Sequence, residues 1–242
     1  MKYNEIQAAM NKKVILLIAL LALPLLSPAP VRAWELVGDS LQPVGLPTRS
    51  QGIPQPLQMD LDEDGEKETL ELNNGQARIV SGIHLRWRSP IGWEVRQASL
   101  GDLNHDGSVE AVLLVWRPFK PWPVDRWLPR GGRIDRFQND RGKSCQIILI
   151  GWSKGAFRER WAGSALAEPV STFGLADLNH DGKVELVTLD STYSASPSAA
   201  ASVLKVWEWN GFGFSLVSKV QGIFSNLRVV RTNEGHVILL TP

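Results

Sequence analysis

The sequence is poor in residues that support several common chemistries. Its 242 residues contain one cysteine, Cys145, and four histidines, so we expect neither an internal disulfide nor a zinc site of clustered His and Cys ligands. No phosphate-binding glycine loop is present, and Ser164 lacks the flanking glycines of a nucleophile elbow. Cys145 begins the apolar stretch 145–150, where we expect a buried small hydrophobic side chain. These absences disfavour a conventional enzyme.

Long hydrophobic runs are scarce, and the N-terminal one is short. Lys12 and Lys13 precede the apolar run 14–26, and small residues stand at positions −3 and −1 of a cleavage site after Ala33. This pattern predicts a secretory signal peptide over residues 1–33. Such a run reaches only about 20 Å as a helix, against a bilayer core of about 30 Å, although an uncleaved membrane anchor stays open. We expect an extracytoplasmic protein, secreted or associated with the cell surface, without a membrane span after cleavage.

A large excess of charge of either sign is also missing. The formal net charge of the chain is +1, and removal of residues 1–33 leaves 22 of the 26 basic and 24 of the 25 acidic side chains, a net charge of −2. A protein that neutralises nucleic-acid phosphates needs an excess of positive charge. We therefore expect no nucleic-acid partner.

What the sequence does contain is a nine-residue segment that occurs three times. Each copy has oxygen-bearing side chains at positions 1, 3, 5 and 9 and glycine at position 6. Calcium takes six to eight oxygen ligands, alternate residues of a tight loop can point inward, and glycine permits the sharp turn. The predicted calcium ligands are Asp60, Asp62, Asp64 and Glu68; Asp102, Asn104, Asp106 and Glu110; and Asp177, Asn179, Asp181 and Glu185. Metal-free turns stay open as the alternative, and we expect any bound calcium to stiffen the structure without reacting.

The segments that follow these loops argue against an EF-hand. An EF-hand needs a bidentate glutamate at position 12, but two of the three copies have Leu113 and Thr188 there. Residues 110–116 and 185–190 are apolar and β-branched runs of strand type, where an EF-hand has helices. The loops therefore belong to a β protein.

At this point the residues carry a family resemblance. Segments 100–112 and 175–187, which surround the second and third loops, resemble the FG-GAP/VCBS repeat of integrin α-chain propellers and of many bacterial secreted proteins. The first copy is less similar, with Lys67 where the others have valine. The resemblance covers most of residues 55–220. It implies a β-propeller whose blades carry calcium in the loop between their first and second strands.

Short strand patterns separated by turns predict the same all-β fold, with four strands in each blade. The expected strands lie near residues 55–60, 69–72, 83–87 and 93–97 in the first blade; 97–102, 110–116, 146–152 and 156–162 in the second; and 171–177, 185–189, 203–209 and 212–220 in the third. The C-terminal tail supplies only two strands, near 226–231 and 236–240, and residues 34–38 and 41–44 supply two more. We predict a small four-bladed propeller over residues 34–242 whose last blade is shared by both termini. Membership in a larger assembled ring stays open.

Two insertions interrupt this regularity, at residues 117–144 and 191–202, each between the second and third strands of its blade. In an up-and-down blade this connection lies on the face opposite the acidic loops, and loops on a rigid scaffold commonly carry binding residues. Flat apolar surface and fixed hydrogen-bond donors are typical of binding hot spots. The candidate ligand-binding residues are Trp122, Arg126, Trp127 and Arg130. In the alternative, the tryptophans cover the sheet.

The interpretation is a binding or scaffold module for an unknown protein or carbohydrate, held rigid by calcium and not an enzyme. The alternative is a secreted carbohydrate-active enzyme, a glycosidase or lyase, that uses the same insertion face. Such an enzyme needs converging carboxylates there, and the insertion offers Asp125, Asp135 and Asp140. His105 and His180 occupy position 4 of their loops, where we expect solvated side chains without a catalytic role.

Overall fold

The computed structural model describes residues 30–120, 137–195 and 199–242, and the strands belong to one compact unit, Val31–Pro242. The described residues contain no helix long and apolar enough to cross a membrane. They form a four-bladed β-propeller of antiparallel sheets. The predicted all-β fold and blade number are confirmed.

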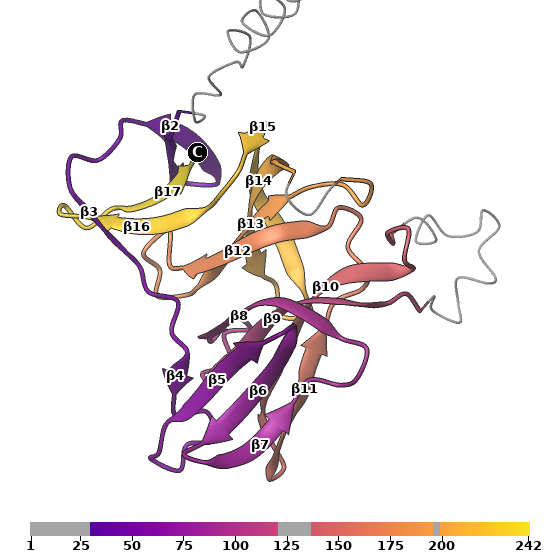
Figure 1. Cartoon of the computed structure of the whole chain (residues 1–242). Helices are drawn as coiled ribbons and strands as arrows, with labels where there is room; N and C mark the ends of the chain where they lie inside the picture. Colours follow the sequence, from indigo (N-terminus) through magenta and orange to yellow (C-terminus); the bar gives the residue numbers. More distant parts are fainter. Residues whose placement is uncertain (1–29, 121–136, 196–198) are drawn as a thin grey trace, which may run out of the picture. The chain divides into compact units, whose positions relative to one another are not determined.

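Three blades are continuous in the chain and are built in strand order (Figure 1). Blade 1 comprises β4 (Gln58–Met59), β5 (Glu68–Asn73), β6 (Gln76–Ser81) and β7 (His84–Arg88); blade 2 comprises β8 (Glu94–Gly101), β9 (Glu110–Pro118), β10 (Lys143–Ser153) and β11 (Ala156–Ala162); blade 3 comprises β12 (Val170–Ala176), β13 (Glu185–Asp190), β14 (Ala201–Trp209) and β15 (Phe214–Phe224). Consecutive strands pair in each blade, so the connections alternate between two faces of the propeller.

Blade 4 is assembled from both ends of the chain, as the sequence predicts. Its strand order is β2–β1–β17–β16–β3, in which the C-terminal strands are β16 (Arg228–Thr232) and β17 (Val237–Thr241). The N-terminal strands are β1 (Arg32–Val37), β2 (Ser40–Val44) and β3 (Ser50–Gly52). Figure 1 shows the indigo N-terminal strands against the yellow C-terminal ones. This pairing covers strand edges that would otherwise stay free.

Side-chain contacts reinforce this closure. The Trp34 indole donates a hydrogen bond to the Thr241 hydroxyl at 2.9 Å, and the Leu41 amide donates one to Ser218 of blade 3 at 2.8 Å. Arg32 already belongs to β1 and Ala33, 2% exposed, lies opposite Leu240. The predicted signal-peptide boundary after Ala33 therefore falls inside the first strand.

The first blade differs from its predicted layout. β6 is absent from the prediction, and segment 93–97, expected as the fourth strand of blade 1, belongs to the first strand of blade 2. Segment 83–87 is the fourth strand instead of the third. The physical reason is a tight hairpin at Asn74 and Gly75, whose φ angles are 50° and 76°. Asn-Gly is the favoured pair for this turn, and it adds a strand that the prediction missed.

The blades pack through apolar clusters at their junctions. One cluster joins blades 1 and 2, one joins blades 2 and 3, and one joins blades 3 and 4. Trp161 of β11 packs edge-on against Trp209 and Phe214 of blade 3, at 5.5 and 5.2 Å between ring centroids. Cys145 is fully buried in the cluster between blades 2 and 3. The interpretation of Cys145 as a core side chain is confirmed.

Candidate metal centres

The three acidic loops share one backbone conformation. Each connects the first strand of its blade to the second, so all three lie on one face of the propeller. Position 4 has a left-handed backbone in every copy, with φ of 61°, 58° and 63°, and the glycine at position 6 has φ of 91°, 88° and 84°. The residues concerned are Glu63, His105 and His180, followed by Gly65, Gly107 and Gly182. Since L side chains rarely adopt φ near 90°, glycine at position 6 is required by the turn.

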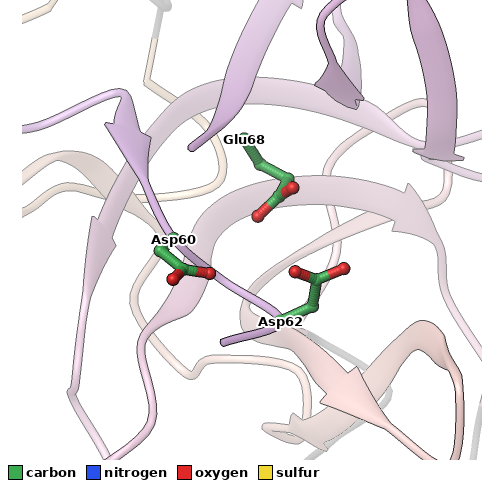
Figure 2. A group of neighbouring side chains, drawn as sticks. All are labelled: Asp60, Asp62 and Glu68. Atoms are coloured by element: carbon green, nitrogen blue, oxygen red, sulfur yellow. The ribbon is translucent and has the colours of Figure 1, made fainter. Parts of the chain in front are cut away.

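In loop 1, three carboxylates each have one anchored oxygen and one free oxygen. The Gly65 amide donates to Asp60 Oδ2 at 3.0 Å, the Leu61 amide donates to Glu68 Oε2 at 2.9 Å, and Arg86 holds Asp62 Oδ2 at 2.7 Å. The other oxygens, Asp60 Oδ1, Asp62 Oδ1 and Glu68 Oε1, are buried without a hydrogen-bond partner. Figure 2 shows the three carboxylates turned toward a common centre.

The spacing of these oxygens fits one cation. Ligand atoms of Asp60, Asp62 and Glu68 all lie within 4.8 Å of one another. Two oxygens that bind one Ca²⁺ at about 2.3–2.6 Å can be no more than about 5 Å apart. Buried carboxylate oxygens without donors are costly unless a cation or a proton satisfies them. The donor set, all oxygen and carboxylate-rich, suits a hard cation such as Ca²⁺ better than zinc or copper.

Loop 2 shows the same frame with more of its oxygens engaged. The amides of Asp106 and Gly107 donate to the two oxygens of Asp102 at 3.1 and 3.0 Å. The Asn104 amide nitrogen donates to Glu110 Oε1 at 2.7 Å and to Asp106 Oδ2 at 3.2 Å. Glu110, 1% exposed, keeps Oε2 buried without a partner. One buried oxygen is therefore available to a cation without breaking any contact.

Loop 3 repeats the pattern of loop 2. The amides of Asp181 and Gly182 donate to Asp177 at 3.1 and 3.0 Å, and the Leu178 amide donates to Glu185 Oε2 at 2.6 Å. Glu185 is 1% exposed, and its Oε1 is buried and unpaired. The glutamate at position 9 is thus the constant feature of the three loops, with one oxygen tied to the loop backbone or to Asn104 and the other turned inward.

Burial raises the pKa of all three position-9 glutamates. The pKa of Glu110 rises to about 8 and that of Glu185 to about 7, first because burial disfavours the charged form and then because loop aspartates lie nearby. The pKa of Glu68 is raised for the same leading reason. Neighbouring carboxylates that oppose one another's ionisation form a site that a divalent cation would relieve.

Every predicted loop ligand is in the described part of the chain, but the structure does not use them equally. Asp60, Asp62 and Glu68 converge, whereas Asp64 is exposed and accepts the Glu66 amide through Oδ1 at 2.9 Å. The position-5 aspartates of the other loops accept a backbone amide in the same way. The position-5 aspartates therefore hold the turn through one oxygen, and in loop 2 the second oxygen of Asp106 also accepts from Asn104 and Arg160.

The position-4 histidines behave differently from each other. His180 is exposed, as expected. His105 is not simply solvated, because its Nε2 lies 3.0 Å from the carbonyl oxygen of Val184 in loop 3. The expectation for His105 was wrong, because its ring contacts the neighbouring loop, although its backbone conformation matches that of the exposed His180. Loops 2 and 3 are thereby in direct contact.

Sequence reasoning missed two arginines that contact the loops. Arg86 of β7 pairs with Asp62 and lies over the ring of Trp152 at 5.1 Å. Arg160 of β11 donates to Asp106 Oδ2 at 3.1 Å. Both come from the fourth strand of their blades, far from the loops in sequence, and no local pattern identifies them.

The candidate ligand-binding residues Trp122, Arg126, Trp127 and Arg130 lie outside the described residues, as do Asp125 and Asp135. Asp140 is described and lines a groove between blades 2 and 3. The connections β9–β10 and β13–β14 do fall between second and third strands, on the face opposite the acidic loops, as the sequence predicts.

Comparison with known proteins gives no identification: no family model, curated protein or solved structure matches this chain. The class of protein that the fold defines is a small four-bladed β-propeller with three acidic loops on one face.

Proposed function

We propose that this protein is an exported, calcium-binding β-propeller of the FG-GAP/VCBS type that acts as a binding or scaffold module for protein or carbohydrate. Calcium has a structural role in this proposal and stiffens the connection between the first two strands of blades 1, 2 and 3. Export rests on the signal-peptide pattern of residues 1–33.

One observation carries the calcium proposal. In each of three loops, a glutamate that is at most 1% exposed keeps one carboxylate oxygen buried and unpaired. A group of this kind, repeated three times at the same loop position, is costly without a cation or a proton. In loop 1 the free oxygens of two further aspartates face the same centre. This supports a cation site better than plain turns do.

The binding role rests on the opposite face. The long second-to-third strand connections lie there, and the described part of that face holds two hollows, of about 550 and 1250 Å³. Ligand sites are typically concave, with volumes of about 300–1,000 Å³, a range that includes the smaller hollow. The hollows and the acidic loops lie on opposite faces. The proposed ligand site and the proposed structural calcium sites are therefore at opposite ends of the blades.

The enzyme alternative has less support. Glu94, Asp140 and Glu168 line the larger hollow. Glu94 accepts from Arg96 at 3.1 Å and from Lys143 at 3.0 Å, and Glu168 pairs with Lys205. A glycosidase needs one carboxyl group with a raised pKa and a second carboxylate facing it. Here the pKa of Glu94 is lowered by its contacts with Lys143 and Arg96, which outweigh the opposing effect of burial.

Thermal unfolding with and without calcium tests the proposal. We expect calcium to raise the melting temperature of the chain from Val31 onward relative to a chelator. The gain should shrink in Asp106→Ala and Asp181→Ala. A ligand that binds only the folded state stabilises it by about 2.7 kcal/mol at 100 times its dissociation constant. A melting temperature indifferent to calcium in the unsubstituted protein would refute the proposed metal role.

A further inference from the structure

The smaller hollow lies at one end of blade 2, beside the connection from blade 1, on the face opposite the acidic loops. Its walls come from the C-terminal ends of β9 and β11, from β10, and from the turn that precedes β8. Its volume is about 550 Å³, within the range of about 300–1,000 Å³ for small-molecule sites. Trp93, Phe119, Pro90 and Pro118 supply its apolar part.

A buried amide in the wall lacks one hydrogen-bond partner. Gln146 of β10 is 6% exposed, and its Nε2 donates to the Ser144 hydroxyl at 3.2 Å. Its Oε1 is buried without a partner. Whichever way the amide is turned, only one of its ends contacts Ser144. The other end lacks a partner in a residue that lines the hollow, and unpaired buried polar atoms are costly and uncommon in proteins.

A cation in the same wall is poorly neutralised. Arg117 lies over the Trp93 ring at 5.4 Å, and its Nη1 is 3.8 Å from Glu159 Oε2, too far for a hydrogen bond. Burial lowers the pKa of Arg117, since the charged form loses water. Lys120 adds a second positive charge and is exposed. The hollow therefore presents excess positive charge beside apolar surface.

The larger hollow offers an internal comparison. Arg96 of β8 also lies over a tryptophan, Trp116, at 4.3 Å, but its Nε donates to Glu94 at 3.1 Å. Two arginine–tryptophan stacks thus occur on the same blade. The arginine of one, Arg96, is hydrogen-bonded to a carboxylate, and the arginine of the other, Arg117, is not. The Arg117 pair with Glu159, at 3.8 Å, is the longer of the two and leaves its guanidinium less neutralised.

We propose that the smaller hollow binds a sugar acid, a polyhydroxylated ring that carries a carboxylate. The carboxylate pairs with Arg117, a hydroxyl bonds the free end of the Gln146 amide, and the ring packs against Trp93 and Phe119. This inference rests on the proposed binding role and specifies its ligand class. A peptide fits less well, because the prolines of the wall have no N–H to donate to peptide carbonyls.

Calorimetric titration of the full chain in saturating calcium tests the inference, with glucuronate, an oligoglucuronate, glucose and an acetylated dipeptide acid as probes. We expect the two acids to bind and glucose to bind at least about tenfold more weakly, since a charge-assisted hydrogen bond is lost. Equal affinity per sugar for the two acids would identify the ligand as a free sugar acid or a chain end. Tighter binding of the oligomer would identify it as an acidic polysaccharide.

Variants of the two hollows test whether glucuronate binds in the smaller one. Arg117→Gln should weaken glucuronate binding about tenfold or more, and Gln146→Glu should abolish it by adding a negative charge of similar shape. Arg96→Gln, the matched stack in the larger hollow, should leave it unchanged. Unaltered melting temperatures would show that the variants fold.

Three results would overturn the inference: no binding of either acid, equal affinity in Arg117→Gln, or tighter binding of the dipeptide acid. Calcium binding is measured separately, so the two proposals fail independently. Sugar-acid binding without calcium binding would refute the proposed metal centres and support this binding site. Calcium binding without sugar-acid binding would refute this binding site alone.

Discussion

Loop 1 and loops 2 and 3 have the same backbone, but their carboxylates are engaged differently. In loop 1 position 3 is Asp62, whose Oδ1 is buried and unpaired. In loop 2 position 3 is Asn104, whose amide nitrogen bonds both Glu110 and Asp106. A carboxylate cannot donate to another carboxylate, whereas an amide can link two of them. In loop 2 the position-3 amide therefore satisfies two carboxylates without a cation, whereas Asn179 of loop 3 accepts the Asp181 amide.

The arginines extend the contrast. Arg86 contacts Asp62, whose side chain is 3% exposed, while Arg160 contacts Asp106, whose side chain is 34% exposed. The first pair lies in a region of low dielectric, and the second is screened by water. Loop 1 thus depends more on the guanidinium of Arg86 than loop 2 depends on Arg160, and under the proposed function it also gains more from a bound metal ion.

The largest expected effect comes from the position-9 glutamates. Glu68→Gln and Glu110→Gln should each reduce the calcium-dependent rise in melting temperature. That rise is about 5–10 °C for the unsubstituted protein, if calcium contributes about 2.7 kcal/mol and each kcal/mol gives about 2–4 °C. In chelator both variants should melt at or above the unsubstituted protein, because an amide avoids the cost of burying or protonating a carboxylate beside like-charged neighbours.

Differential scanning calorimetry with calcium and with chelator measures both parts of this prediction. Glu71→Gln in β5 is the matched control, since the Glu71 side chain is 36% exposed and its carboxylate lies 3.7 Å from Arg78. If the loop glutamates merely held the fold, both variants would lose stability equally in the two conditions.

The next effect separates the two arginines. Arg86→Gln should destabilise the protein in chelator by about 1–3 kcal/mol, because Asp62 keeps a buried charge without its partner. Arg160→Gln should cost less than about 1 kcal/mol, as expected of an exposed ion pair. Urea unfolding of both variants checks the order, and equal costs would show that the burial difference between the loops has no energetic consequence.

A reciprocal exchange at position 3 should change calcium affinity. Asp62→Asn should weaken binding at loop 1, and Asn104→Asp should strengthen it at loop 2, each by about tenfold, because ligand charge tunes calcium affinity. Calcium titration followed by calorimetry gives both constants. Changes of the same sign in the two variants would contradict the role assigned to position 3.

The smallest effect concerns a residue remote from the loops. Cys145 is fully buried, and burial raises the pKa of its thiol to about 12, so almost no reactive thiolate exists near pH 8. We expect a thiol reagent to label it only after unfolding, and calcium to slow the labelling. Fast labelling of the folded protein would show that the junction between blades 2 and 3 opens without loop involvement.

An acidic loop marks the first connection of all three continuous blades, but the sequence predicts the strand layout of only two of them. Blades 2 and 3 follow the expected order, and the closure of blade 4 by both termini is confirmed. The prediction fails in blade 1, where Ile83, 94% exposed, was counted into a third strand. The hairpin at Asn74 and Gly75 was missed, although Asn-Gly is a strong turn signal.

The candidate site was predictable only in its local part. Spacing identified the loop oxygens because positions 1, 3, 5 and 9 are close in the chain. Arg86 lies 24 residues from Asp62, and Gln146 and Arg117 meet only through strand pairing. No periodicity encodes contacts that depend on how four strands and two blades pack, so these residues required the structure.

A calcium titration that counts sites tests the central claim most directly. Isothermal calorimetry of the chain from Val31 onward should show saturable binding, with a stoichiometry of up to three that falls by one in each of Glu68→Gln, Glu110→Gln and Glu185→Gln. Absence of saturable binding at millimolar calcium, or a stoichiometry that the three substitutions leave unchanged, would contradict it.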